Sequence, residues 1–152
     1  IYTNFDTLSL HDALPIWPLV IQDGVKLSLF DVSDPTKPIE KFTEIIGGRG
    51  AYSQLNYDHK ALLFHKEKDI FAFPIVIYDE NNKHDYRLEF QGAFVYGIDV
   101  NKGFTRHLEI THTKSEDNYY ESWEEDIRRV LYINDHLYAV SPKQITSHKI
   151  TW

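Results

Sequence analysis

The chain has 152 residues, of which 42% are hydrophobic and 14% aromatic, enough for one domain with a packed core. Its formal net charge is -7, with Lys and Arg scattered, so it lacks the basic surface that nucleic acid or an anionic membrane attracts. The absence of cysteine excludes disulfides, thiolate zinc sites and cysteine nucleophiles, and no apolar run reaches the roughly 20 residues of a membrane-spanning helix.

The first segment, residues 1–16, differs from the rest of the chain. TLSLHDALPI (7–16) reads as a short amphipathic helix, whereas everything after it is typical of strands. The same stretch is the translation, without a mismatch, of ACT CTT TCC CTA CAC GAC GCT CTT CCG ATC, which is part of a common sequencing-library adapter. We therefore expect residues 1–16 to be a non-native, adapter-derived segment without regular structure, fused to a truncated gene, and residues 17–152 to form the domain.

From residue 25 onward, short apolar or alternating runs bounded by turn residues predict an all-β protein. GGRG (47–50) is expected to break the chain, since glycine permits positive φ, and Gly103 suits the left-handed position of a hairpin loop. Residues 121–130 compete as a helix but lack a sustained apolar stripe at helical spacing. The expected strands are residues 25–32, 40–46, 61–64, 70–78, 92–100, 104–111, 128–133, 136–141 and 144–150.

An internal repeat organises these strands. VKLSLFDVSDPTKPIEKFTEI lies over GAFVYGIDVNKGFTRHLEI, with Asp31 against Asp99 within about a residue. KALLFHKEKDIFAFP lies over RVLYINDHLYAVSP, with Ala61–Phe64 against Val130–Ile133 without a gap. Four antiparallel strands repeated in tandem are typical of a β-propeller. The expected fold class is therefore all-β, a fragment of a β-propeller with about two four-stranded blades: the last two strands of one blade, one full blade and the opening strands of another.

Several motifs also carry a family resemblance: KLSLFDVSDPTKP, GGRGAYS, DHKALLF, FAFPIVI, QGAFVYGIDV, LEITH and RRVLYINDHLYAVS. Together they resemble the C-terminal blades of secreted bacterial and archaeal proteins that are described as having a β-propeller domain. The resemblance extends from about residue 20 to the end of the chain. It implies a propeller outside the cell or on its surface, of unsettled role, with further blades upstream that would be this domain's partners.

Most candidate catalytic or metal-ligating residues have a simpler interpretation. Asp58 and His59 adjoin before a strand, where we expect turn and blade-to-blade hydrogen bonds. His107 and His112 lie five residues apart on one extended segment, so their side chains are expected to point to opposite faces, and no pair of histidines has the close spacing of zinc ligands. DENNKHD (79–85) begins with the spacing of a calcium loop but lacks its third ligand and glycine. Ser53 near His59 lacks a third triad member. We expect no metal and no cofactor.

The best candidate for binding is SEDNYYESWEED (115–126), in which six carboxylates alternate with aromatic residues. A solvated loop is the simpler interpretation. The alternative is a rim surface that binds a cation, a sugar or a protein, because such surfaces present exposed aromatic side chains among polar groups. The candidate binding residues are Tyr119, Tyr120, Trp123, Glu124 and Asp126.

Two functions remain open because propellers support both. The first is a non-catalytic binding module that engages a protein or carbohydrate ligand outside the cell. The second is a hydrolase-like propeller enzyme whose channel active site is completed by blades missing from this chain. Clustering of Asp58, His59 and the 115–126 loop around one channel mouth would favour the enzyme, and dispersal would favour the binding module. A purely structural spacer is a third reading.

Overall fold

The computed structural model describes residues 23–79, 87–113 and 121–151. The segment 1–16 and the candidate residues Tyr119 and Tyr120 lie outside them. The described strands are β1 (Asp23–Asp31), β2 (Ile39–Arg49), β3 (Leu63–His65), β4 (Ile70–Tyr78), β5 (Leu88–Asp99), β6 (Gly103–Ile110), β7 (Arg129–Ile133), β8 (His136–Val140) and β9 (Ile145–Lys149), and the short 3-10 turns are η1 (Gln54–Asn56), η2 (His59–Ala61) and η3 (Lys66–Lys68). None of the described helical turns has the length and apolar character needed to cross a membrane.

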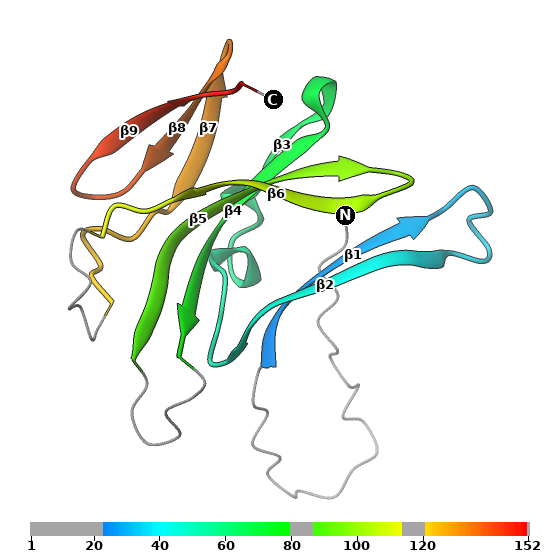
Figure 1. Cartoon of the computed structure of the whole chain (residues 1–152), viewed down its shortest axis with the longest axis horizontal. Helices are drawn as coiled ribbons and strands as arrows, with labels where there is room; N and C mark the ends of the chain where they lie inside the picture. Colours follow the sequence, from blue (N-terminus) through cyan, green and yellow to red (C-terminus); the bar gives the residue numbers. More distant parts are fainter. Residues whose placement is uncertain (1–22, 80–86, 114–120, 152) are drawn as a thin grey trace, which may run out of the picture.

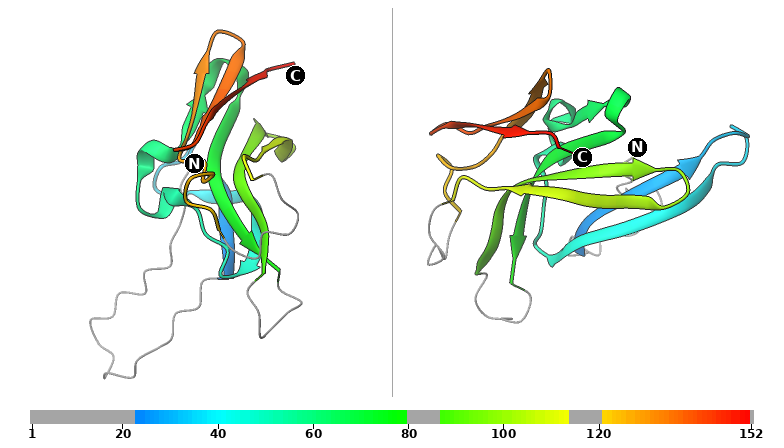
Figure 2. Two further views of the ribbon diagram at one scale, coloured as in Figure 1. Left: turned by 90° about the vertical axis from the view of Figure 1, so that its left-hand side faces the viewer. Right: turned by 45° about the horizontal axis from the view of Figure 1, so that its top comes forward.

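The strands form three antiparallel sheets in chain order: β1-β2, β3-β4-β5-β6 and β7-β8-β9. Figures 1 and 2 show the first and third sheets on opposite sides of the four-stranded one. The sheets contain two, four and three strands in chain order. The sequence repeat predicts this division, with one complete blade between two incomplete ones. The predicted all-β propeller class is therefore confirmed.

The middle sheet is buried on both faces. One face meets β7–β9 in what we call the aliphatic cluster: Leu63, Ile70, Ala72, Ala93, Val95, Ile110, Ile127, Val130, Leu137, Ala139 and Ile150. The other face meets β1–β2 in the aromatic cluster: Val25, Leu27, Ile46, Phe71, Phe73, Ile75, Phe94 and Tyr96. Burial of apolar surface between neighbouring sheets, with contacts only to neighbours, is how repeated units stabilise one another.

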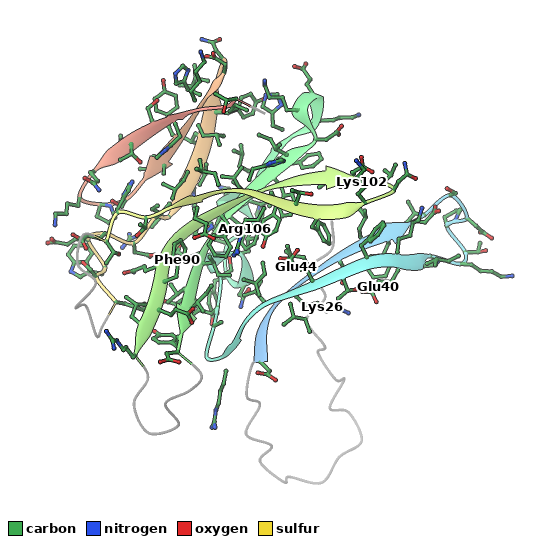
Figure 3. All side chains as sticks on the ribbon, in the orientation of Figure 1. Lys26, Glu40, Glu44, Phe90, Lys102 and Arg106 are labelled. Carbon is green, nitrogen blue, oxygen red and sulfur yellow. The ribbon has the colours of Figure 1, made fainter. Side chains whose placement is uncertain are left out.

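Stacked rings fill the aromatic cluster. The ring centre of Phe71 lies 5.5 Å from that of Tyr96 and 5.9 Å from that of Phe73. The Tyr96 hydroxyl crosses the interface and donates to the carboxylate of Glu44 over 2.7 Å. Figure 3 labels Glu44 on β2. Burial, with this bond to Glu44, raises the pKa of the Tyr96 phenol. The hairpin β1–β2 is thus held on the middle sheet by the packing of Val25, Leu27 and Ile46 in the cluster with these rings and by a hydrogen bond to a charged carboxylate.

GGRG breaks the chain as predicted, but only at its last residue: β2 ends at Arg49, and Gly50, with φ +87°, lies in the turn that follows. The expected end of the strand at residue 46 is wrong, because β2 continues through Gly47 and Gly48 to Arg49, which pairs with Asp23, and the register shifts between that pair and Val25 paired with Ile46. Gly47 has φ +65°, as its position in the motif suggested. The physical reason is that a positive φ accommodates a bulge inside a strand as well as a turn that ends it.

The repeat is confirmed at its hairpin ends. Asp31 and Asp99 each end a strand and each accept a hydrogen bond from the backbone N–H two residues later, over 2.9 Å from Ser33 and 2.8 Å from Asn101. These Asx turns start the two hairpin loops in the same way. The two aspartates are therefore equivalent, as the sequence overlay predicts.

The second half of the overlay is wrong by one residue. Leu62 packs on the aromatic cluster and Val130 belongs to the aliphatic cluster, so each faces the sheet that precedes its own. Leu62, rather than Ala61, is therefore the equivalent of Val130. Because neighbouring strand residues point to opposite faces, a slip of one residue would exchange the two buried faces of the sheet.

A charged network on the outward face of β1–β2 predicts an acid-dependent stability. Hydrogen bonds from Ser28, Thr43 and Lys26 lower the pKa of Glu40 from 4.5 to about 2, and Lys26 Nζ lies 3.0 Å from its carboxylate (Figure 3). A lowered pKa stabilises the fold above about pH 4.5, and this stabilisation disappears as the pH falls from 4.5 towards 2. We expect Glu40→Gln to lose less stability than the natural chain over that interval, measured by urea denaturation at several pH values.

Glu67→Gln, on the exposed turn η3, is the matched control and should keep the acid sensitivity of the natural chain. An equal loss of stability in Glu40→Gln and the natural chain between pH 4.5 and 2 would show that the network does not hold Glu40 ionised.

Candidate functional site

A row of three side chains crosses one end of the middle sheet. Tyr52 forms a bridge to Val76 through two backbone hydrogen bonds of 3.0 and 2.9 Å, and Val76 pairs with Gln91 on β5. Residues directly opposite each other in antiparallel pairs point to the same face. Tyr52, Val76 and Gln91 therefore lie side by side on one face, although they come from three parts of the sequence.

The chain contacts β4 at Tyr52, which bridges to Val76, and contacts it again at Leu63, which pairs with Ala72. Between these two anchors, connection 53–62 makes the turns η1 and η2. Ser53 caps η1 by accepting from Leu55 N–H over 3.2 Å, and its hydroxyl donates to the carbonyl of Pro74. Side-chain caps that satisfy free N–H groups explain why these short turns form here.

The loop 121–126 docks on this row. Gln91 makes two bonds to the Ser122 backbone: its amide donates to the carbonyl over 3.2 Å and its oxygen accepts from N–H over 3.0 Å. The Tyr52 hydroxyl donates to Glu121 and the Gln54 amide donates to Asp126, each over 2.6 Å. We call Tyr52, Gln54, Gln91, Glu121, Ser122 and Asp126 the rim cluster. Its bonds bind the third sheet's leading loop to the edge of the middle sheet.

The electrostatics of the rim cluster follow from burial. Desolvation raises the pKa of Asp126, and the amides of Gln91 and Gln54 act in the opposite direction. Desolvation, followed by the bond to Glu121, also raises the pKa of the Tyr52 hydroxyl. A carboxyl group whose charged form is disfavoured by burial yet supported by hydrogen bonds is typical of binding and catalytic sites.

The structure places three of the predicted binding residues on this loop, in different settings. Trp123 is 67% exposed and Glu124 is exposed as well, so both side chains face solvent. Asp126 is half-buried and accepts the bond from Gln54. The loop therefore presents one exposed aromatic ring and one exposed carboxylate beside the hydrogen-bonded side chains of the rim cluster. The prediction for Tyr119 and Tyr120 falls outside the described residues.

Asp58 has the structural role that its sequence position suggested. It caps η2 by accepting from Lys60 N–H over 2.9 Å, and it forms an ion pair with Arg129 at the start of β7. The bond from Lys60 and then the pairing with Arg129 lower the pKa of Asp58. His59 is exposed at the start of η2. Both residues lie before β3, as the sequence suggested, and Asp58 makes one bond within its turn and one to the next sheet.

Sequence reasoning missed Tyr52, Gln54, Gln91 and Arg129. Nothing in the local pattern singles them out, since each acquires its role only when connection 53–62, β5 and the third sheet meet. Within residues 23–79, 87–113 and 121–151, no group of three or more His, Asp or Glu side chains could hold a metal ion. Of the calcium-like segment 79–85, only Asp79 is described.

A hollow of about 430 Å³ lies at the hairpin ends of the first two sheets. Its lining residues are Leu29, Phe30, Asp31, Val32, Ser33, Lys41 and Val100. Val32 and Val100 are both more than half exposed, so the hollow is a shallow apolar surface. It lies at the carboxyl end of β1 and β5, whereas Gln91 of the rim cluster lies near the start of β5.

Comparison with known proteins agrees with the repeat. A family model described as "Beta propeller domain" matches residues 10–151 of the chain. No curated protein and no solved structure matches it. The matched residues include all three sheets, and the two buried faces of the middle sheet correspond to contacts between consecutive blades.

Proposed function

The chain belongs to the beta propeller domain family, and on that premise we propose that it is a non-catalytic binding module whose contact surface is the loop 121–126 on the rim cluster. We further propose a location outside the cell or on its surface, which the resemblance of its motifs to secreted propeller proteins supports. The ligand class that fits best is carbohydrate, such as a cell-wall polysaccharide, with a protein as the alternative.

The observation that carries this proposal is the setting of Trp123. Its side chain is 67% exposed, yet the loop that bears it is fixed on both sides, by Ser122 bonded to Gln91 and by Asp126 bonded to Gln54. A large aromatic ring presented on a pre-ordered loop gives contact area with little loss of conformational entropy on binding. Such rings carry a large share of the binding energy at interfaces.

The chemistry around Trp123 favours a sugar. An indole face packs against the apolar C–H face of a pyranose, and the exposed carboxylate of Glu124 accepts hydrogen bonds from its hydroxyls. Tyr57, which is 83% exposed on connection 53–62, adds a second aromatic ring near Tyr52. Aromatic rings beside hydrogen-bond acceptors meet both requirements of carbohydrate recognition.

We expect Trp123→Ala to weaken retention on the ligand at least tenfold, because truncation of a central aromatic contact typically costs about 2 kcal/mol or more. The probes are insoluble peptidoglycan, chitin and cellulose, measured by depletion of the chain from solution. Ile145→Ala is the matched control, since Ile145 is 66% exposed but lies on β9. Retention by none of the three polysaccharides, or retention that Trp123→Ala leaves unchanged, would contradict the carbohydrate proposal.

A hydrolase-like enzyme is the second candidate, and Asp126 is the observation that favours it. This carboxyl group has a raised pKa, shares the rim cluster with Glu121, and lies where connection 53–62 meets the loop. Asp58 of the same connection, however, is paired with Arg129, which is a structural use. Release of soluble sugar from the same polysaccharides, abolished by Asp126→Asn, would favour the enzyme over the binding module.

A further inference from the structure

Two histidines share one hydroxyl group between the second and third sheets. His112, which is 2% exposed and follows β6, has Nδ1 2.8 Å from the Ser141 hydroxyl and Nε2 2.8 Å from the Thr146 hydroxyl. The Thr146 hydroxyl also lies 3.0 Å from Nε2 of His148. We call His112, Ser141, Thr146 and His148 the histidine relay.

The histidine relay bridges elements that also meet through apolar contacts, the rim cluster and the Asp58–Arg129 ion pair. His112 belongs to the segment that leaves the middle sheet, whereas Ser141 follows β8 and both Thr146 and His148 lie on β9. The Ser141 hydroxyl is tied in turn to the backbone of Gln144 in the turn before β9. The relay therefore fastens the end of β8 and strand β9 of the third sheet to the segment that leaves the middle sheet.

The count of hydrogen-bond donors and acceptors in the relay matches neutral imidazole rings. A neutral imidazole has one donor and one acceptor nitrogen, so a single chain of bonds can run from Ser141 through His112 and Thr146 to His148 with every group satisfied. When both rings are protonated, two cations face the one Thr146 oxygen. The Glu125 carboxylate favours a charge on His112, but it already pairs with Lys143 over 2.7 Å.

We propose that the histidine relay is an acid-sensitive latch, closed when His112 and His148 are neutral and opened when they take up protons. The charged groups around it are His148 on β9, Glu125 in the loop before β7 and Lys143 after β8. Like-charge repulsion and the cost of charging a buried ring then act together against the contact between β9 and the segment after β6.

The direction of the pH dependence follows from the electrostatics. Burial, and then the neighbouring His148, lower the pKa of His112 from 6.5, with Glu125 acting weakly in the opposite direction. Burial also lowers the pKa of His148. A histidine whose pKa is lowered in the fold stabilises that fold fully above pH 6.5 and destabilises it progressively as the pH falls below 6.5.

Amide hydrogen exchange on the full chain between pH 7.5 and 5 tests the latch, with rates corrected for intrinsic exchange. We expect protection of amides in β8 and β9 to fall by up to about tenfold per pH unit for each histidine that titrates. Amides in β4 and β5, at the centre of the middle sheet, should keep their protection. His112→Gln retains hydrogen-bonding groups but cannot titrate, so its β8 and β9 protection should depend less on pH.

His148→Gln is the second variant, because His148 lies on β9 and is only half-buried, so its replacement tests the relay even where His112→Gln does not fold. His59→Gln, at an exposed position outside the relay, is the control and should behave like the natural chain. Constant protection of β8 and β9 across the pH range would overturn the latch. So would a loss shared equally by β4 and β5, or one that His148→Gln leaves unaltered.

Discussion

Phe71→Ala is expected to lower the free energy of unfolding by about 3–5 kcal/mol, since the loss of a buried phenyl ring removes its transfer free energy and leaves a cavity. Phe71 has no exposed surface, and its ring lies 5.5 Å from Tyr96, 5.9 Å from Phe73 and 6.0 Å from Phe104, measured between ring centres. The cavity would open in the aromatic cluster, where β1–β2 meets the middle sheet. Urea denaturation followed by circular dichroism measures the change.

Phe64→Ala provides the matched control. Phe64 pairs directly with Phe71 across β3 and β4 and points to the same face, but it is 48% exposed. Its truncation should cost less than half as much, because little apolar area returns to water. Equal losses in the two variants would mean that β1–β2 does not cover this face of the middle sheet in solution.

Gly92→Ala is expected to destabilise the chain by about 1–3 kcal/mol and to impair the rim cluster as well. A methyl group on Gly92 would lie 2.1 Å from the carbonyl oxygen of Ile110 and 2.7 Å from the ring of Phe90. The carbonyl belongs to the backbone of β6, so it can move only if β5 and β6 separate locally. Gln91, the residue before Gly92, would then shift away from Ser122.

The readouts are thermal unfolding and polysaccharide retention, compared with Gly97→Ala. Gly97 lies on the same strand, but the nearest obstacle to its methyl group is the Nε2 end of the His107 side chain, which can rotate. Gly97→Ala should therefore lower the melting temperature less than Gly92→Ala does. The reverse order would show that β6 is not fixed against β5 at Ile110.

The features predicted correctly from sequence are those that local chemistry determines. Asp31 and Asp99 start their hairpin loops through their own side chains, and Gly103 takes the left-handed position, with φ +83°, that its place in the loop indicates. Signals of this kind need only neighbouring residues, so one sequence contains them in full.

The features that sequence reasoning missed depend on how the sheets face one another. Tyr52 meets Glu121 and Gln54 meets Asp126 across separations of 69 and 72 residues. No local pattern records these contacts, because they arise only when loop 121–126 lies over the edge of the middle sheet. The one-residue error in the repeat has the same origin: the direction in which Leu62 points is set by the neighbouring sheet.

Connection 53–62 has a consequence for how new specificity can arise in this chain. Both of its ends are fastened to β4, through Tyr52 opposite Val76 and Leu63 opposite Ala72. Between Gln54 and Asp58, which bond to the third sheet and its leading loop, such a segment can change in length and composition at little cost to the frame, because closing a longer loop costs only slightly more entropy. It therefore offers a natural grafting position, where evolution or a protein engineer can exchange recognition loops while the sheets stay as they are.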